Sequence, residues 1–164
     1  MPINTLLLIA ATLLCGLTTG LVFAFTVVVM PGIRMLPDRE FLGAFKAIDR
    51  IIQNNDPLFL LAWVGSVILL IAAGVMNVTV LSGLHRLLLI GAVVSYLLGV
   101  QLPTFVVNVP LNNRLQVIEL SALDAAALQM ARETFESRWI YWNAFRTVFG
   151  LLTTALLLAV VHFS

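Results

Sequence analysis

Long apolar stretches alternate with polar segments along the whole chain. The four stretches cover residues 2–33, 57–84, 87–113 and 147–161. The first three are each long enough to cross about 30 Å of hydrocarbon as a helix, and the fourth becomes so once residues 139–146 are added. Because backbone amides in lipid must bond within their own segment, the stretches predict helices and not strands. The pattern therefore predicts an all-α membrane protein, a four-helix transmembrane bundle forming one domain over residues 1–164.

The polar connections between the stretches differ in length. Those over residues 34–56 and 114–138 are long, whereas the one around His85 and Arg86 is very short. With four crossings, both long connections lie on the same side of the membrane. Three polar clusters then meet at that end, at residues 53–56, 108–113 and 139–146. We expect any ligand site of the protein at this end.

The basic residues predict the orientation. Arg86 is alone on the side of the short connection, whereas the long connections carry Arg34, Arg39, Lys46, Arg50, Arg114, Arg132 and Arg138. The positive-inside bias then puts the long connections in the cytoplasm and both termini outside. We expect an integral protein of a bacterial inner membrane, surrounded by membrane lipid.

Composition excludes several classes of protein. With 61% hydrophobic and 10% charged residues, the chain is too apolar for a water-soluble domain. Its net charge of +1 includes no basic patch for phosphate, so no nucleic-acid partner is expected. Cys15 is the single cysteine and is expected to be buried, within a first stretch that is retained as a span. His85 and His162 lie opposite the polar clusters, and we expect no metal and no cofactor.

The segment after Pro37 predicts an amphipathic helix with Asp38 as its cap. Its apolar stripe is Phe41, Phe45, Ile48 and Ile52. The charged residues lie mainly elsewhere on the helical wheel, namely Arg39, Lys46, Asp49 and Arg50. Such a helix rests in the headgroup layer, or alternatively forms a solvated connector. Asp56 and Pro57 then predict the start of the second span.

Glycine and proline mark features of the other spans. Gly16 and Gly20 form a small-xxx-small pattern that lets a neighbouring helix approach and offers a surface for oligomerisation. Pro31 and Gly32 are expected to end the first helix. Pro103 removes a backbone hydrogen bond to Gly99 and predicts a kink, where the nearby polar side chains could bond the freed carbonyl: Gln101, Thr104 and Asn108.

The last helix is predicted to be long. Residues 121–124 match a capping box that begins with Ser121, and no Pro or Gly interrupts residues 122–149. Leu128, Ala131, Phe135 and Trp139 follow one face, so this helix is expected to run unbroken into the fourth span. Its part before Trp139 would then extend roughly 25 Å beyond the hydrocarbon.

Arg146 is the most informative single residue. It shares one helix face with Trp139, Trp142 and Asn143. An arginine at full membrane depth costs at least about 2.5 kcal/mol, so it should face the bundle or a wet cavity. The alternative is that it reaches back to the interface, with the tryptophans as belt residues.

Amide side chains gather at the same end as Arg146 and include Asn54, Asn108, Asn112, Asn113 and Gln101. Amides offer donors and acceptors without charge, which suits a neutral carbonyl or phenol in a half-buried site. We predict that Arg146 faces inward and contacts at least one of Asn54, Asn108, Asn112 or Asn113. The alternative for Asn112 and Asn113 is an ordinary turn.

Short motifs in the chain resemble those of a known family. They are Pro110-Leu111-Asn112-Asn113 with Leu115, Arg138-Trp139, Trp142-Asn143-Ala144-Phe145-Arg146-Thr147 and Gly20, Phe23 and Pro31. With them the chain resembles the anthrone oxygenase-like family of small four-helix membrane proteins. Fungal members oxidise anthrones to anthraquinones with molecular oxygen and no known metal or flavin, whereas most bacterial members have no assigned function.

The resemblance implies roles for the residues at this end. The positions that match the family pattern are Asn112, Trp139, Asn143 and Arg146. We expect Arg146, Asn143 and Asn112 to be catalytic. Trp139 is expected to bind substrate together with other residues at this end: Trp142, Asn54, Asn108, Asn113 and Gln101. Arg146 and the amides would stabilise the enolate oxygen of an anthrone. A general base is missing from this picture, because no histidine is near and Asp49, Asp56 and Glu119 are only loosely placed.

Three functions remain open on this evidence. The first is an anthrone oxygenase-like protein that binds a hydrophobic aromatic or polycyclic small molecule at the polar end, with oxidation by O₂ as a further step. The second is a non-catalytic accessory subunit or lipid/quinone-binding protein. The third is a transporter, although no internal repeat is evident.

Overall fold

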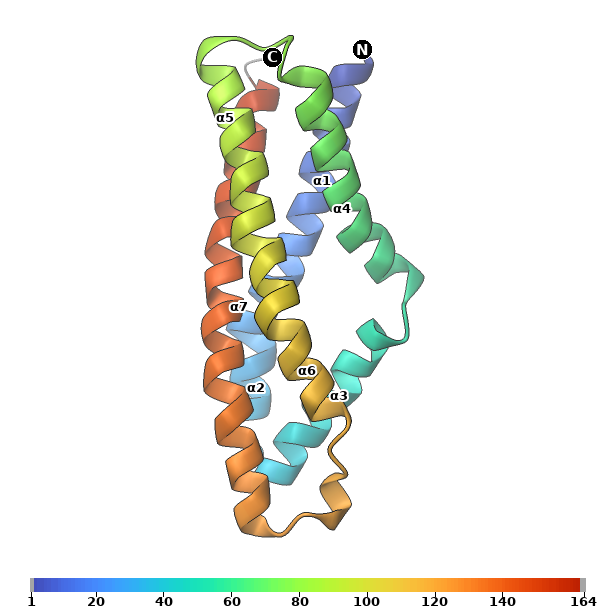
Figure 1. The fold of residues 1–164 in the computed structure, drawn as a ribbon, viewed down its shortest axis with the longest axis vertical. Coiled ribbons are helices and arrows are strands. Elements are labelled where there is room, and N and C mark those ends of the chain that lie inside the picture. Colours follow the sequence, from blue (N-terminus) through green and yellow to red (C-terminus); the bar gives the residue numbers. More distant parts are fainter. Residues whose placement is uncertain (1, 163–164) are drawn as a thin grey trace.

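The computed structural model describes residues 2–162, which form a bundle of four long helical spans (Figure 1). The spans are Ile3–Arg34, Pro57–Asn77, Gly83–Gln116 and Ala125–His162, each long and apolar enough to cross a membrane. The described residues contain no strand. The all-α, four-span prediction is thereby confirmed. Both ends of the chain lie at the same end of the bundle as the link between α4 and α5 (Figure 1).

Eleven elements make up the described chain. In order, they are α1 (Ile3–Ala24), the π-helical η1 (Phe25–Val29), α2 (Met30–Arg34), α3 (Asp38–Gln53), α4 (Pro57–Asn77), α5 (Gly83–Val94), the π-helical η2 (Ser95–Gln101) and η3 (Thr104–Asn108), α6 (Val109–Gln116), the 3₁₀ turn η4 (Leu120–Ala122) and α7 (Ala125–His162). The first span continues past Pro31 and Gly32 and ends at Arg34, so the expected end at these residues is wrong. The π-helical η1 directly precedes α2, which contains the proline, and supplies the wider turn that accommodates it.

Pro103 is accommodated by wider turns on either side of it. The π-helical η2 and η3 flank the proline. The Thr104 hydroxyl donates to the Val100 carbonyl at 2.7 Å, one residue beyond the expected Gly99. The other two polar residues bond different elements: the Gln101 side chain accepts from the Trp63 indole, and Asn108 donates to the Trp139 carbonyl.

Several helix boundaries differ from the predicted ones. The short connection covers residues 78–82, so His85 and Arg86 lie inside α5. Ser121 does not cap α7; its hydroxyl donates to Glu119 at 2.6 Å. The cap is Asp124, whose carboxylate accepts from the Ala127 amide at 2.8 Å, because a charged acceptor nearer the helix start bonds its donors better.

Two further capping predictions have opposite outcomes. Asp56 caps α4 as expected, with its carboxylate accepting from the Leu58 and Phe59 amides at 3.0 and 2.9 Å. Asp38 lies in the first turn of α3 and does not cap it. Its carboxylate instead forms an ion pair with Arg132 of α7 at 3.0 Å.

The apolar stripe of α3 packs inside the protein. Phe41 and Phe45 are fully or almost fully buried, and the Phe45 ring lies 4.6 Å from that of Phe135 and 5.2 Å from that of Trp139, between ring centroids. The helix is amphipathic as predicted, and its buried stripe rules out the solvated connector. A place in the headgroup layer stays a prediction. The first turns of α7 are not a free extension, because α3 and α6 pack against this part of the chain.

Arg132 fastens the turn between α2 and α3 onto α7. Its guanidinium donates to the Asp38 and Glu136 carboxylates at 3.0 and 2.7 Å, and to the Leu36 and Arg34 carbonyls at 2.9 and 2.7 Å. The Arg34 side chain also donates to Glu136, at 2.6 Å. This network sets where α3 lies and therefore which of its residues face the bundle.

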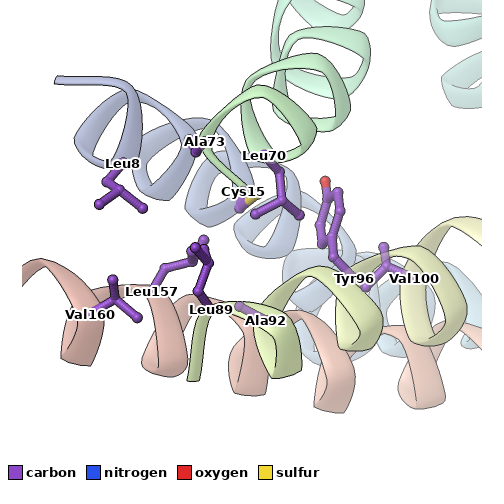
Figure 2. Packing of buried hydrophobic residues seen from close by; sticks show 11 residues of the cluster. Leu8, Cys15, Leu70, Ala73, Leu89, Ala92, Tyr96, Val100, Leu157 and Val160 are labelled. Carbon is purple, nitrogen blue, oxygen red and sulfur yellow. The ribbon is translucent and has the colours of Figure 1, made fainter. Parts of the chain in front are cut away.

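A separate apolar core holds the spans together toward the two chain ends (Figure 2). It contains Leu8 and Cys15 of α1, Leu70 and Ala73 of α4, Leu89, Ala92, Tyr96 and Val100 of the third span, and Leu157 and Val160 of α7. The burial of Cys15 is confirmed. The Tyr96 hydroxyl, which would be costly if left unpaired in this core, bonds the Ser66 hydroxyl at 2.6 Å.

The two glycines of the small-xxx-small pattern have different surroundings. A Cβ on Gly16 would lie 3.9 Å from Thr154 of α7, so Gly16 faces a neighbour in its own chain. Gly20 is exposed and has nothing within 4 Å of such a Cβ. An oligomer formed through Gly16 and Gly20 stays a prediction.

Gly99 marks the closest approach of the third span to α7. A Cβ there would lie 2.2 Å from Cγ of Phe149, so Gly99→Ala forces the ring or a helix to move. We expect this variant to lose about 1–3 kcal/mol of unfolding free energy in detergent. Gly20→Ala is the matched control, with an expected change within about 0.5 kcal/mol. Equal effects of the two substitutions would contradict the close approach.

Candidate functional site

A cavity of about 260 Å³ lies among α1, α3, α4, η3, α6 and α7. Its apolar walls include Leu21, Phe25, Phe45, Ile52, Phe59 and Trp63. Its polar residues are Asp49, Thr104, Asn108, Asn112, Asn143 and Arg146, with Trp139 beside them. We call it the polar cavity. Two of the three expected clusters, residues 108–113 and 139–146, supply polar groups to it. The third expected cluster, residues 53–56, does not line it; Asp49 of α3 and Thr104 of η3 do.

Arg146 points into the bundle and is only 5% exposed. Its Nη1 donates to the Thr104 hydroxyl at 2.9 Å, and its Nη2 donates to Asn143 Oδ1 at 2.7 Å. Its Cζ lies 5.8 Å from the centre of the Trp139 ring. The inward position is confirmed and the reach to the interface is wrong. Its hydrogen-bond partners among the described residues are Thr104 and Asn143, and none of the four expected amides. Thr104 lies one helical turn before Asn108 in the third span, and Asn143 lies one turn before Arg146 on α7.

Two buried polar atoms on residues that line this cavity have no hydrogen-bond partner among the described residues. They are Nε of Arg146 and Oδ1 of Asn108. Within residues 2–162, Arg146 also forms no ion pair. A buried charge held only by neutral groups is costly. The arrangement therefore suits a ligand that presents an oxygen acceptor to Arg146 and a hydroxyl donor to Asn108.

Asn143 holds Arg146 in place. Its amide nitrogen donates to the Val22 carbonyl at 2.9 Å and to the Thr26 hydroxyl at 2.8 Å, both in the first span. Its oxygen accepts from Arg146. Since both amide hydrogens are engaged, Asn143 is suited to positioning the guanidinium and not to binding a ligand itself.

Asp49, which the sequence suggested only as a loosely placed candidate base, lies in the site. It is 2% exposed, although it was placed off the apolar stripe of α3. Its Oδ1 accepts from Asn112 at 2.7 Å, and its Oδ2 accepts from Gln116 at 2.8 Å and from Gln53 at 3.2 Å. Its position, four residues after Phe45 and eight after Phe41, is the signal that could have found it.

Trp139 links the cation to the carboxylate. Its ring lies beside the Arg146 guanidinium, and its indole nitrogen donates to Asn112 Oδ1 at 2.8 Å. The amide nitrogen of Asn112 then donates to Asp49. A buried positive group and a buried negative group thus line one cavity without forming an ion pair with each other.

The other predicted binding residues lie outside the polar cavity. Trp142 is half-buried and packs on Tyr141 and Phe145, with ring centroids at 5.6 and 5.3 Å. Asn54 and Asn113 are exposed. Five of the predicted residues are brought together in the cavity: Arg146, Asn143, Asn112, Trp139 and Asn108.

Gln101 is buried but does not line the polar cavity. Its oxygen accepts from the Trp63 indole at 3.1 Å, and its amide nitrogen is without a partner in the described part of the chain. Gln101 thus holds Trp63, which lines the polar cavity. Across residues 2–162, no group of three or more His, Cys, Asp or Glu side chains could hold a metal ion.

Comparison with known proteins identifies the family. No curated protein and no solved structure matches the chain. The family model described as anthrone oxygenase matches residues 53–156, a region that includes Thr104, Asn108, Asn112, Trp139 and Arg146. Asp49 lies just before the matched region. Since this region is more than half of the 164 residues, the chain belongs to the anthrone oxygenase family.

Proposed function

We propose that the protein binds an oxygen-bearing, fused aromatic molecule in the polar cavity and oxidises it with O₂, as in the conversion of an anthrone to an anthraquinone. The observation that carries this proposal is the unpartnered Nε of buried Arg146 in a cavity that also holds the buried Asp49 carboxylate. Membership of the anthrone oxygenase family supports it.

Each polar group has a role in this reaction. Asp49 removes a proton from the ring methylene. Its carboxylate has roughly four lone-pair positions. Three of them accept from amide donors, which leaves one free for the proton. Arg146 Nε donates to the enolate oxygen that forms. Asn108 Oδ1 accepts from a ring hydroxyl, and the Trp139 ring packs on the aromatic rings. Asn143, Thr104 and Asn112 are positioning residues.

The reaction balances with O₂ as the only oxidant. The enolate transfers one electron to O₂, and the carbon radical and superoxide combine into a carbon–oxygen bond. Protonation gives a hydroperoxide, which loses the second methylene proton and breaks its O–O bond, releasing water and leaving a carbonyl. One anthrone and one O₂ thus become one anthraquinone and one water. The apolar walls of the cavity suit both the rings and O₂.

A non-catalytic lipid/quinone-binding protein or accessory subunit is the second candidate. The observation that favours it is the pair of hydrogen bonds that Asp49 accepts from Asn112 and Gln116, which join α3 to α6. In that case Asp49 is a structural anchor, and a bound quinone or lipid carbonyl accepts from Arg146 without reacting.

We also propose that the polar cavity lies toward the cytoplasm of a bacterial inner membrane. Seven basic residues of the long connections stand against Arg86 at the other end, which supports this orientation. Single-cysteine variants on a Cys15→Ala background test the orientation. One replaces exposed Glu133 at the long-connection end, and the other replaces exposed Val80 in the short connection. A membrane-impermeant maleimide added to whole cells is expected to label position 80 and not position 133. The reverse labelling would invert the proposed orientation.

The first test of catalysis is Asp49→Asn. The amide keeps the shape of the side chain but cannot take a proton, so turnover of 1,8-dihydroxyanthrone is expected to fall about 10²–10⁴-fold. The thermal shift caused by 1,8-dihydroxyanthraquinone is expected to remain. Glu40→Gln makes the same chemical change at an exposed position of α3 and serves as control. Wild-type turnover in Asp49→Asn would contradict its role as base, and binding without turnover in the wild type would favour the second candidate.

The second test is Arg146→Leu. The variant loses the only cation of the polar cavity, and we expect it to lose the anthraquinone-induced thermal shift while the bundle stays folded. Loss of its two hydrogen bonds is expected to cost about 1–3 kcal/mol of stability. Arg138→Leu removes the same charge from an exposed position of α7, and His85→Ala changes the opposite end. Both should keep the shift; loss of the shift in His85→Ala with its retention in Arg146→Leu would place the site at the other end.

A further inference from the structure

A second cavity, of about 650 Å³, adjoins the polar cavity along α1, α3 and α4. We call it the lateral groove. The two share five lining residues: Leu21, Phe25, Ile52, Phe59 and Trp63. Because the same side chains wall both spaces, one elongated molecule could occupy the two together.

The lateral groove offers no free polar side-chain group to a ligand. Thr18 and Trp63 are its two residues with polar side-chain atoms. The Thr18 hydroxyl donates to the Ala62 carbonyl at 3.2 Å, and the Trp63 indole donates to Gln101 at 3.1 Å. Whatever lies in the groove is therefore hydrocarbon, in contrast to the oxygen-bearing molecule that the polar cavity suits.

The outer rim of the groove is apolar and exposed. Leu17 of α1, Leu58 and Leu61 of α4 and Ile51 of α3 line it, and Leu58 is 75% exposed. In Figure 1, the end of α4 that follows α3 leans away from α6. The residues that line the groove come from α3, from this part of α4 and from the first span. Since α1 and α4 are long and apolar enough to cross a membrane, we expect this rim to face lipid.

Two aromatic rings form a firm wall between the spaces. Phe59 and Trp63 are stacked, with ring centroids 5.5 Å apart and planes 24° from parallel. Gln101 fixes the Trp63 indole. A linear chain can pass along this wall, whereas a fused ring system is better placed in the polar cavity, beside Trp139.

We propose that the ligand of the polar cavity is an amphiphile whose oxygen-bearing aromatic head lies against Arg146 and whose linear hydrocarbon substituent lies in the lateral groove. This inference rests on the proposed function for the head. It adds that the substrate is drawn from the lipid phase and carries a tail. A lipid acyl chain that only fills the groove is the competing occupant.

The tail should act through fit and not through hydrophobic transfer. Lipid is as apolar as the groove, so moving a tail between them gains little free energy. Blocking the groove is therefore more informative than lengthening the tail. A large side chain in the groove should weaken binding of a tailed ligand and leave that of a tailless one unchanged.

The experiment compares two probes in lipid nanodiscs. They are 1,8-dihydroxyanthraquinone and the same compound with an n-octyl chain on a ring carbon. Ala62→Trp places an indole in the groove, and Ala72→Trp makes the same change at an equally half-buried position of α4 outside it. We expect Ala62→Trp to weaken binding of the octyl probe at least tenfold and that of the tailless probe less than twofold. Ala72→Trp should leave both unchanged.

A second measurement uses the wild-type protein and so does not depend on the folding of Ala62→Trp. An octyl probe with a diazirine at the end of its chain is expected to label Leu17, Ile51 or Leu58, and unlabelled octyl probe should prevent this labelling. Labelling spread over lipid-facing residues such as Ile71 and Leu151, without competition, would overturn the inference and leave bilayer lipid as the occupant.

The outcomes separate the two proposals. If the wild type binds the tailless probe through Arg146 but Ala62→Trp weakens both probes equally or neither, the tail inference fails and the proposed function stands. If the wild type binds neither probe, the proposed function fails and the tail inference fails with it.

Discussion

The site depends on the burial of one guanidinium without an opposing carboxylate. Arg146 is held by the Thr104 hydroxyl and the Asn143 amide and lies beside the Trp139 ring. Neutral dipoles of this kind stabilise a buried charge only in part. Asn143 in turn donates to the Val22 carbonyl and the Thr26 hydroxyl, so the residue that holds the guanidinium also joins α7 to the first span. A ligand oxygen at Nε would complete the coordination of the charge.

The negative side of the cavity has a different origin. Asp49 lies on α3. The position of α3 against α7 is set by the Arg132 ion pairs and by the packing of Phe45 on Phe135 and Trp139. Two of the amide donors to Asp49, Asn112 and Gln116, then connect α3 to α6. Together these contacts keep the cation and the carboxylate on the walls of one cavity but apart from each other, which is the arrangement that the proposed reaction needs.

Hydropathy and helix signals were sufficient to predict the four spans, the Asp56 cap and the inward position of Arg146, since each depends on local sequence and the cost of charge in lipid. The place of α3 was not predictable in this way. Its Phe41 and Phe45 stripe fits a membrane surface as well as a protein surface, and only the fold shows Phe135 opposite. Asp49 was only loosely placed for the same reason, and Thr104 was missed because a hydroxyl near Pro103 was expected to serve the backbone alone; it does both.

The central claim is that Nε of Arg146 receives an oxygen of an aromatic ligand inside the bundle. An experimental structure of the protein in lipid with bound 1,8-dihydroxyanthraquinone tests it most directly. The account predicts a quinone oxygen within hydrogen-bonding distance of Arg146 Nε and a ring hydroxyl near Asn108 Oδ1. A ligand bound elsewhere, with Arg146 Nε turned toward a lipid phosphate, would contradict it.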